Sequence, residues 1–147
     1  FTHLPVLWES TSLCELDCMI QQKRICGVQA HPILARIRSY RGKVWYYPPN
    51  WPIGDAQSQR LTSFLFCELG RAYDFRGAFD SRATLMAWLL RRYTREDLRR
   101  EFCSELVAAA LRRIGWLATD NCSAWSPNRL ARHLVRQQIF GRPWRVQ

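Results

Sequence analysis

The sequence lacks long apolar runs and closely paired cysteines. Its longest purely apolar stretches are only a few residues, which predicts neither a transmembrane helix nor a secretory signal peptide. Cys14, Cys18 and Cys26 cluster, but no Cys-x-x-Cys pair occurs and no histidine stands at ligand spacing. We therefore expect no structural zinc, no cofactor and no disulfide-dense scaffold.

Negative charge and lysine are also scarce. There are 22 Lys and Arg against 12 Asp and Glu, which gives a net charge of +10, and only Lys23 and Lys43 are lysines. So basic a surface favours an anionic partner, either the acidic polymers of a cell wall or anionic lipid. A solvated exterior without a partner is the alternative. Nucleic acid is disfavoured, because no binding motif is present and the Arg-rich stretches also contain Asp and Glu.

What is present suffices for one globular domain. The 147 residues are 48% apolar and include seven tryptophans, enough for a core without disulfide support. No internal repeat, low-complexity tract or linker divides the chain, so we expect a single domain over 1–147.

Local patterns predict alternating short strands and helices. We expect strands at 5–10, 43–48 and 141–146, where β-branched or aromatic residues are bounded by polar residues, Gly or Pro. Helices are expected within 28–42 with Pro32 at a first helical position, and at 55–69, ending before Gly70. Further helices are expected at 81–93, from Phe102 to about Gly115, and from Pro127, with Ser126 as the cap.

The stretch "REFCSELVAAALRRIG" places a cysteine where a helix is expected to begin. Its apolar stripe comprises Phe102, Leu106, Val107, Ala110, Leu111 and Ile114, with Cys103 near the middle. Unpaired N–H groups in a first helical turn lower the pKa of a thiol and can stabilise an oxyanion. The alternative is that Cys103 packs as one more small apolar residue, the usual role of a cysteine on such a face.

Several motifs occur together in an order that resembles one family. They are "LWES" (7–10), "GVQAHPI" (27–33), "KVWYY" (43–47), "LGRAYDF" (69–75), "EFCSELV" (101–107) and a later "SP..L" (126–130). In combination the sequence is similar to the permuted NlpC-like papain-fold hydrolases, the group that includes the YiiX-type proteins. The resemblance implies a circularly permuted papain-like α+β fold, in which a small antiparallel sheet packs against helices.

The same resemblance implies a set of catalytic residues. Cys103 is the nucleophile, Glu9 is the carboxylate that orients an imidazole, and His3 is the best available general base. His3 precedes Glu9 by only six residues, too few for the hairpin that joins the two positions in the family. Either the connection differs here or the family's histidine precedes Phe1. His31 and His133 are more easily interpreted as surface or packing residues.

Three further residues belong to the implied motif. Tyr73 and Asp74 match the family's "YD" and Ser104 follows the cysteine, so the three are expected to line the substrate site. Tyr73 and Asp74 have an equally plausible role as an aromatic anchor and a turn residue. Glu105 lies on the polar side of the helix, where it is expected to cap or form a salt bridge.

These residues predict a cysteine hydrolase that cleaves an amide, of the peptidoglycan type, through a thioester. A lipid or acyl hydrolase or thioesterase on the same fold is the first alternative. The second is an inactive papain-like structural or binding component of a larger assembly, such as a virion. The sequence leaves secretion, delivery as an effector and association with a virion open as locations.

Overall fold

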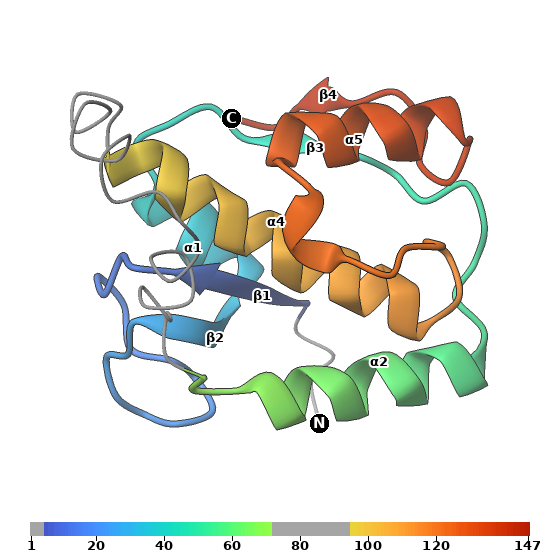
Figure 1. Cartoon of the computed structure of the whole chain (residues 1–147). Coiled ribbons are helices and arrows are strands. Elements are labelled where there is room, and N and C mark those ends of the chain that lie inside the picture. The colour runs from blue at the N-terminus through green and yellow to red at the C-terminus, as the bar shows by residue number, and fades with distance from the viewer. Residues whose placement is uncertain (1–4, 72–94) are drawn as a thin grey trace, which may run out of the picture.

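The first two strands form an antiparallel pair. β1 (Val6–Thr11), expected from the sequence, pairs with β2 (Gly27–Pro32) in a register that sets Leu7 against His31 and Glu9 against Gln29. The computed structural model describes residues 5–71 and 95–147, with backbone alone for 95–102, and this part of the chain is a mixed α+β fold (Figure 1).

β2 was not expected from the sequence, which predicted only a helix within 28–42 with Pro32 at a first helical position. That helix is confirmed as α1 (Ile33–Ser39), which begins directly after Pro32. The backbone of Val28 donates to the Arg71 carbonyl and accepts from the N–H of Gly70, while Ala30 accepts from Met19. β2 is therefore bonded along both edges by distant segments, and these non-local partners make residues 27–32 a strand.

Helix α2 (Asp55–Glu68) agrees with the sequence prediction, including its end. Gly70 has a φ of +76°, a left-handed conformation that favours glycine. This turn brings the Gly70 N–H within 2.9 Å of the Val28 carbonyl, so the end of α2 is fixed to β2.

Helix α4 (Arg95–Arg113) begins well before the expected start near Phe102. The preceding stretch, "REDLRRE", consists mainly of strong helix formers, so nothing in it ends a helix before the apolar stripe. Within the stripe Leu106, Leu111 and Ile114 are buried, whereas Val107 is exposed. The predicted helix at 81–93 lies outside the described residues.

The C-terminal part agrees with the sequence prediction. After a short 3-10 helix, η1 (Cys122–Ala124), helix α5 (Pro127–Arg136) has Ser126 at its N-cap position and Pro127 in its first turn. β4 (Trp144–Arg145) then pairs antiparallel with β3 (Trp45–Tyr46) to form a second small sheet. Both of these strands fall within the expected segments.

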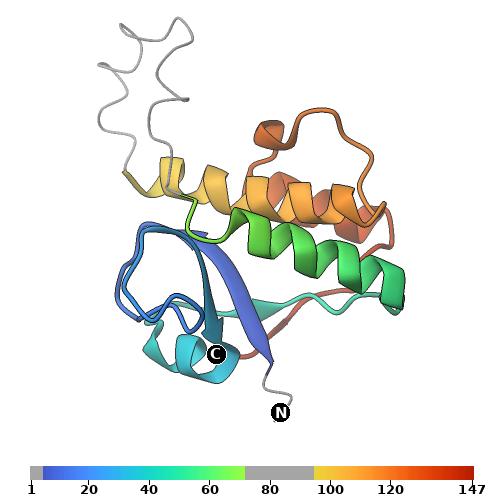
Figure 2. The same cartoon turned by 90° about the horizontal axis from the view of Figure 1, so that it is seen from below.

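Helices lie on both faces of the β1–β2 pair (Figure 2). On one face Trp8 packs edge-to-face on Phe66 of α2, with ring centroids 5.4 Å apart, and α4 runs beside α2. On the other face Arg36 of α1 contacts Glu9. The main apolar core lies between α4, α5 and the segment that follows each; its buried members are Ala108, Leu111, Ile114, Leu117, Leu130, Leu134 and Ile139.

None of the described helices is long and apolar enough to cross a membrane.

Candidate active site

The thiol of Cys103 meets the end of β1. Ser10 lies opposite Val28, whose backbone groups bond to Arg71 and Gly70 on the side away from β1. In an antiparallel pair, two directly opposed residues either bond to each other or both point their backbone groups away from the pair. Ser10 therefore directs its N–H and C=O to the outer edge of β1. Accordingly the Ser10 carbonyl faces α4 and accepts a hydrogen bond from the Cys103 thiol.

The Cys103 thiol is held in its protonated form. Burial raises its pKa from the ordinary 9.0 to about 11, and the negative charge of Glu9 contributes in the same direction. The nucleophile and the carboxylate predicted from the sequence are therefore close enough to interact electrostatically.

This protonation state corrects the expected environment of the thiol. Because α4 begins at Arg95, Cys103 lies in the helix interior rather than in the first turn. Interior N–H groups are already bonded to carbonyls one turn earlier and do not stabilise a thiolate. The lowered pKa expected for a helix N-terminus is therefore wrong, and the oxyanion donors expected there are not available from this helix end.

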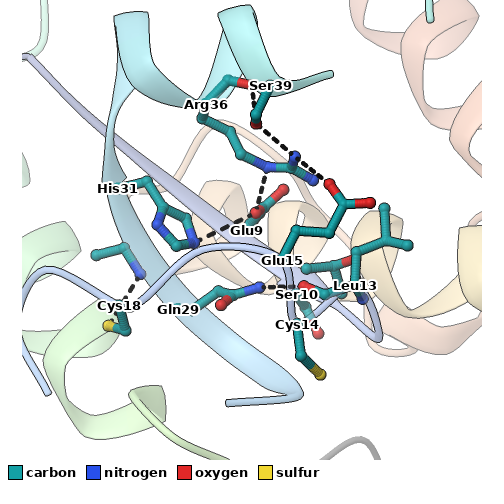
Figure 3. Close-up of polar contacts among 12 residues, drawn as sticks. Glu9, Ser10, Leu13, Cys14, Glu15, Cys18, Gln29, His31, Arg36 and Ser39 are labelled. Carbon is teal, nitrogen blue, oxygen red and sulfur yellow. Dashed lines mark hydrogen bonds and ion pairs between the residues drawn. The ribbon is translucent and has the colours of Figure 1, made fainter. Parts of the chain in front are cut away.

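Glu9 contacts an arginine and lies near a histidine on the face of the β1–β2 pair that α1 covers (Figure 3). Its Oε1 accepts a hydrogen bond from Arg36 Nε at 2.7 Å and lies 3.6 Å from His31 Nε2. The register explains the second approach, because Glu9 and His31 occupy diagonal positions on one face of the strand pair. Arg36 also donates to Ser39 and lies 3.8 Å from Glu15.

His31 is the histidine that the structure brings to Glu9, and its side chain is only 2% exposed. The sequence suggested no more for it than a surface or packing role, and burial agrees with packing. Its proximity to Glu9 could not be read from the sequence, since 22 residues separate the two and only the strand register joins them. His3, the base preferred from the sequence, lies outside the described residues.

Arg36 is a second residue that sequence reasoning missed. Although it belongs to a seven-residue surface helix, it is only 6% exposed, because its side chain reaches back to the carboxylate of Glu9. A buried arginine paired with a partly buried carboxylate fixes the position of both groups. The one signal in the sequence was its place among Ile33, Leu34 and Ile37, where a cation interrupts an apolar pattern.

The other predicted site residues are only partly placed. Ser104 is buried, and its hydroxyl donates to the Trp125 carbonyl. Glu105 accepts a hydrogen bond from the Ser123 hydroxyl at 2.6 Å, which differs from the cap or salt bridge expected of it. Tyr73 and Asp74 lie outside the described residues.

The connection between β1 and β2 contains a disulfide that the sequence did not predict. Cys14 and Cys26 are bonded, with Cα atoms 5.5 Å apart, while Cys18 remains a free, buried thiol. Gln29 donates to the Leu13 carbonyl at 3.1 Å and so ties this loop to β2 (Figure 3). Burial opposes ionisation of Cys18, but backbone N–H groups lower its pKa overall.

Among the described side chains, no group of three or more His, Cys, Asp or Glu is arranged to hold a metal ion. Comparisons with protein-family models, with characterised proteins and with solved structures gave no match to this chain.

Proposed function

We propose that the chain is a cysteine hydrolase that cleaves an amide bond through a thioester, on a permuted papain-like arrangement of helix and strands. The observation that carries the proposal is the meeting of three groups around β1. The Cys103 thiol contacts the strand end, Glu9 acts on that thiol, and His31 adjoins Glu9. A nucleophile, an imidazole and an orienting carboxylate are the groups that acyl transfer needs.

The raised pKa determines how Cys103 would react. Because the thiol is protonated at neutral pH, its proton must leave as sulfur attacks the carbonyl carbon. We assign that proton to a neutral imidazole, which then donates it to the leaving amine as the C–N bond breaks. Water hydrolyses the resulting thioester with the same imidazole as base, which releases the acid and restores the thiol.

His31 is the first candidate for this base and His3 the second. His31 lies 3.6 Å from the carboxylate whose charge also raises the pKa of the Cys103 thiol, so one acidic side chain influences both partners. Glu9 would then hold the imidazole in one tautomer and stabilise the imidazolium formed during attack. His3 stays in the test because the motif order favours it.

The substrate we favour is an amide of the peptidoglycan type. The net charge of +10 suits an anionic wall. An acyl ester or thioester of a lipid suits the same nucleophile and is the alternative substrate.

An inactive binding or structural role is the second candidate function, and one observation favours it. The Cys103 thiol is partly buried and donates to a backbone carbonyl, an arrangement that suits a packed, protonated cysteine. On this proposal the chain keeps a papain-like scaffold without turnover and works within a larger assembly.

The deciding experiment compares turnover of purified muropeptides, lipid thioesters and lipid esters. Cys103→Ser, His31→Gln and Glu9→Gln are each expected to abolish or strongly reduce cleavage of one substrate class, while Cys67→Ser, on the exposed side of α2, leaves it unchanged. Cys103→Ser combined with His31→Gln should cost no more than either alone, because members of one catalytic unit are not additive.

The remaining outcomes separate the alternatives. If His3→Ala loses activity while His31→Gln keeps full activity, the general base is His3 and not His31. If Cys103→Ser keeps its activity, Cys103 is not the nucleophile. No cleavage of any substrate by the parent chain would favour the inactive scaffold.

A further inference from the structure

The positive charge of the chain is concentrated in two segments. Residues 18–54 and 121–147 contain eleven Lys and Arg and no Asp or Glu. The rest of the chain contains eleven Lys and Arg together with all twelve acidic residues. The net charge of +10 therefore originates entirely in these two segments, which are far apart in sequence.

The two basic segments meet in the β3–β4 ribbon. Trp45 pairs with Arg145 and Tyr46 with Trp144, and Val44 bonds through its backbone to Val146 and Gln147. The Gln147 side chain also donates to the Tyr40 carbonyl at 2.7 Å. In Figure 1 the ribbon lies at the top of the molecule, across from α2 at the bottom.

Large apolar side chains are exposed along this ribbon. Trp45 is 53% exposed, Trp144 52% and Val146 47%. The ribbon patch, as we define it, also contains exposed cations; its members are Tyr40, Lys43, Trp45, Tyr46, Trp144, Arg145 and Val146. Exposed apolar groups interspersed with cations are typical of a surface that binds a partner that is both apolar and anionic.

We infer that the ribbon patch docks the protein on an anionic lipid surface. Trp and Tyr favour the boundary between headgroups and acyl chains, and Val146 adds an aliphatic group with an affinity for the same layer. Lys43 and Arg145 supply the attraction to anionic headgroups. Docking does not depend on hydrolysis, so this inference stands or falls separately from the proposed function.

The geometry favours lipid over a nucleic acid. Tyr46 and Trp144 pack edge-to-face, with centroids 5.0 Å apart and planes at 64°. This pair offers no two parallel open ring faces on which successive bases would stack. Insertion into a lipid interface needs no such alignment, because burial of apolar area is non-directional.

The test is co-sedimentation of the full chain with vesicles of phosphatidylcholine alone or mixed with phosphatidylglycerol. We expect binding to the anionic vesicles, weak binding to the neutral ones, and a decrease as salt is raised. The double variant Trp45→Ser/Trp144→Ser should weaken anionic binding by about tenfold or more. Lys43→Gln/Arg145→Gln, which retains the aromatic rings, should weaken it by a similar factor.

Matched controls remove an apolar group and a cation elsewhere. Val107→Ser on α4 and Arg60→Gln on α2 change exposed residues outside the basic segments and should bind like the parent. Circular dichroism checks that every variant folds.

Absence of anionic vesicle binding by the parent would overturn the inference, as would equal losses in controls and ribbon variants. A single-stranded oligonucleotide that binds more tightly than vesicles, with the same dependence on the ribbon, would assign the patch to nucleic acid instead.

Discussion

Replacing Glu9 with glutamine should make Cys103 easier to alkylate. In the parent chain the thiol has a pKa raised from 9.0 to about 11, first by burial and second by the charge of Glu9. At pH 8 a rise of this size decreases the thiolate fraction about a hundredfold. Glu9→Gln removes the second cause and leaves the first, so we expect the alkylation rate at that pH to rise about three- to tenfold.

The assay is iodoacetamide labelling across pH 7 to about 12, with each cysteine followed by peptide mass spectrometry. The pH midpoint is the informative quantity, because burial slows access without changing the midpoint. Cys67, exposed on α2, provides the internal reference, and Glu68→Gln removes a carboxylate from the same helix as a matched control.

Two results would refute this reasoning. A midpoint for Cys103 near 9 in the parent would mean that the thiol is not held protonated, and an unchanged midpoint in Glu9→Gln would separate the carboxylate from the thiol. Under the proposed function the same substitution slows hydrolysis while it speeds alkylation. If Glu9 had only a structural role, the substitution would speed alkylation without slowing hydrolysis.

Two more predictions concern stability. The pKa of Cys103 in the folded protein is raised from 9.0 to about 11, so the stability that depends on the protonated thiol is complete below about pH 9 and is lost as pH rises towards 11. Over this pH range the free energy of unfolding of the parent, measured by urea titration, should fall by about 2 to 3 kcal/mol more than that of Cys103→Ser. Parallel curves for the two chains would contradict this. Arg36→Met leaves the partly buried Glu9 without its closest cation and should cost about 1.5 to 3 kcal/mol, against about 0.5 or less for the exposed Arg38→Met. Equal losses for both would show that the Arg36–Glu9 pair contributes no more than a surface charge.

Elements with local signals were predictable from the sequence. Ser126 and Pro127 mark the start of α5, and Gly70 follows the end of α2 because it adopts a left-handed turn. β2 was not predictable in this way, because its pairing partners come from β1, the 18–23 loop and the end of α2.

The candidate site shows the same division. Cys103 and Glu9 were predicted from motifs, and in the structure the charge of Glu9 contributes to the raised pKa of the Cys103 thiol. The contacts of Glu9 with His31 and Arg36 depend on strand register and on the path of α1, neither of which a single sequence encodes locally. The position of Cys103 within its helix was misjudged because the apolar stripe begins later than the helix does.

The Cys14–Cys26 disulfide has a consequence for the order of folding. β1 ends at Thr11 and β2 begins at Gly27, so the two cysteines lie three residues and one residue from the strand ends. Once the bond forms, the loop that pairing must close is reduced to these few residues, and the effective contact order of the strand pair falls. The register that brings His31 to Glu9 would then be set early, before α4, which comes much later in the chain, supplies the thiol.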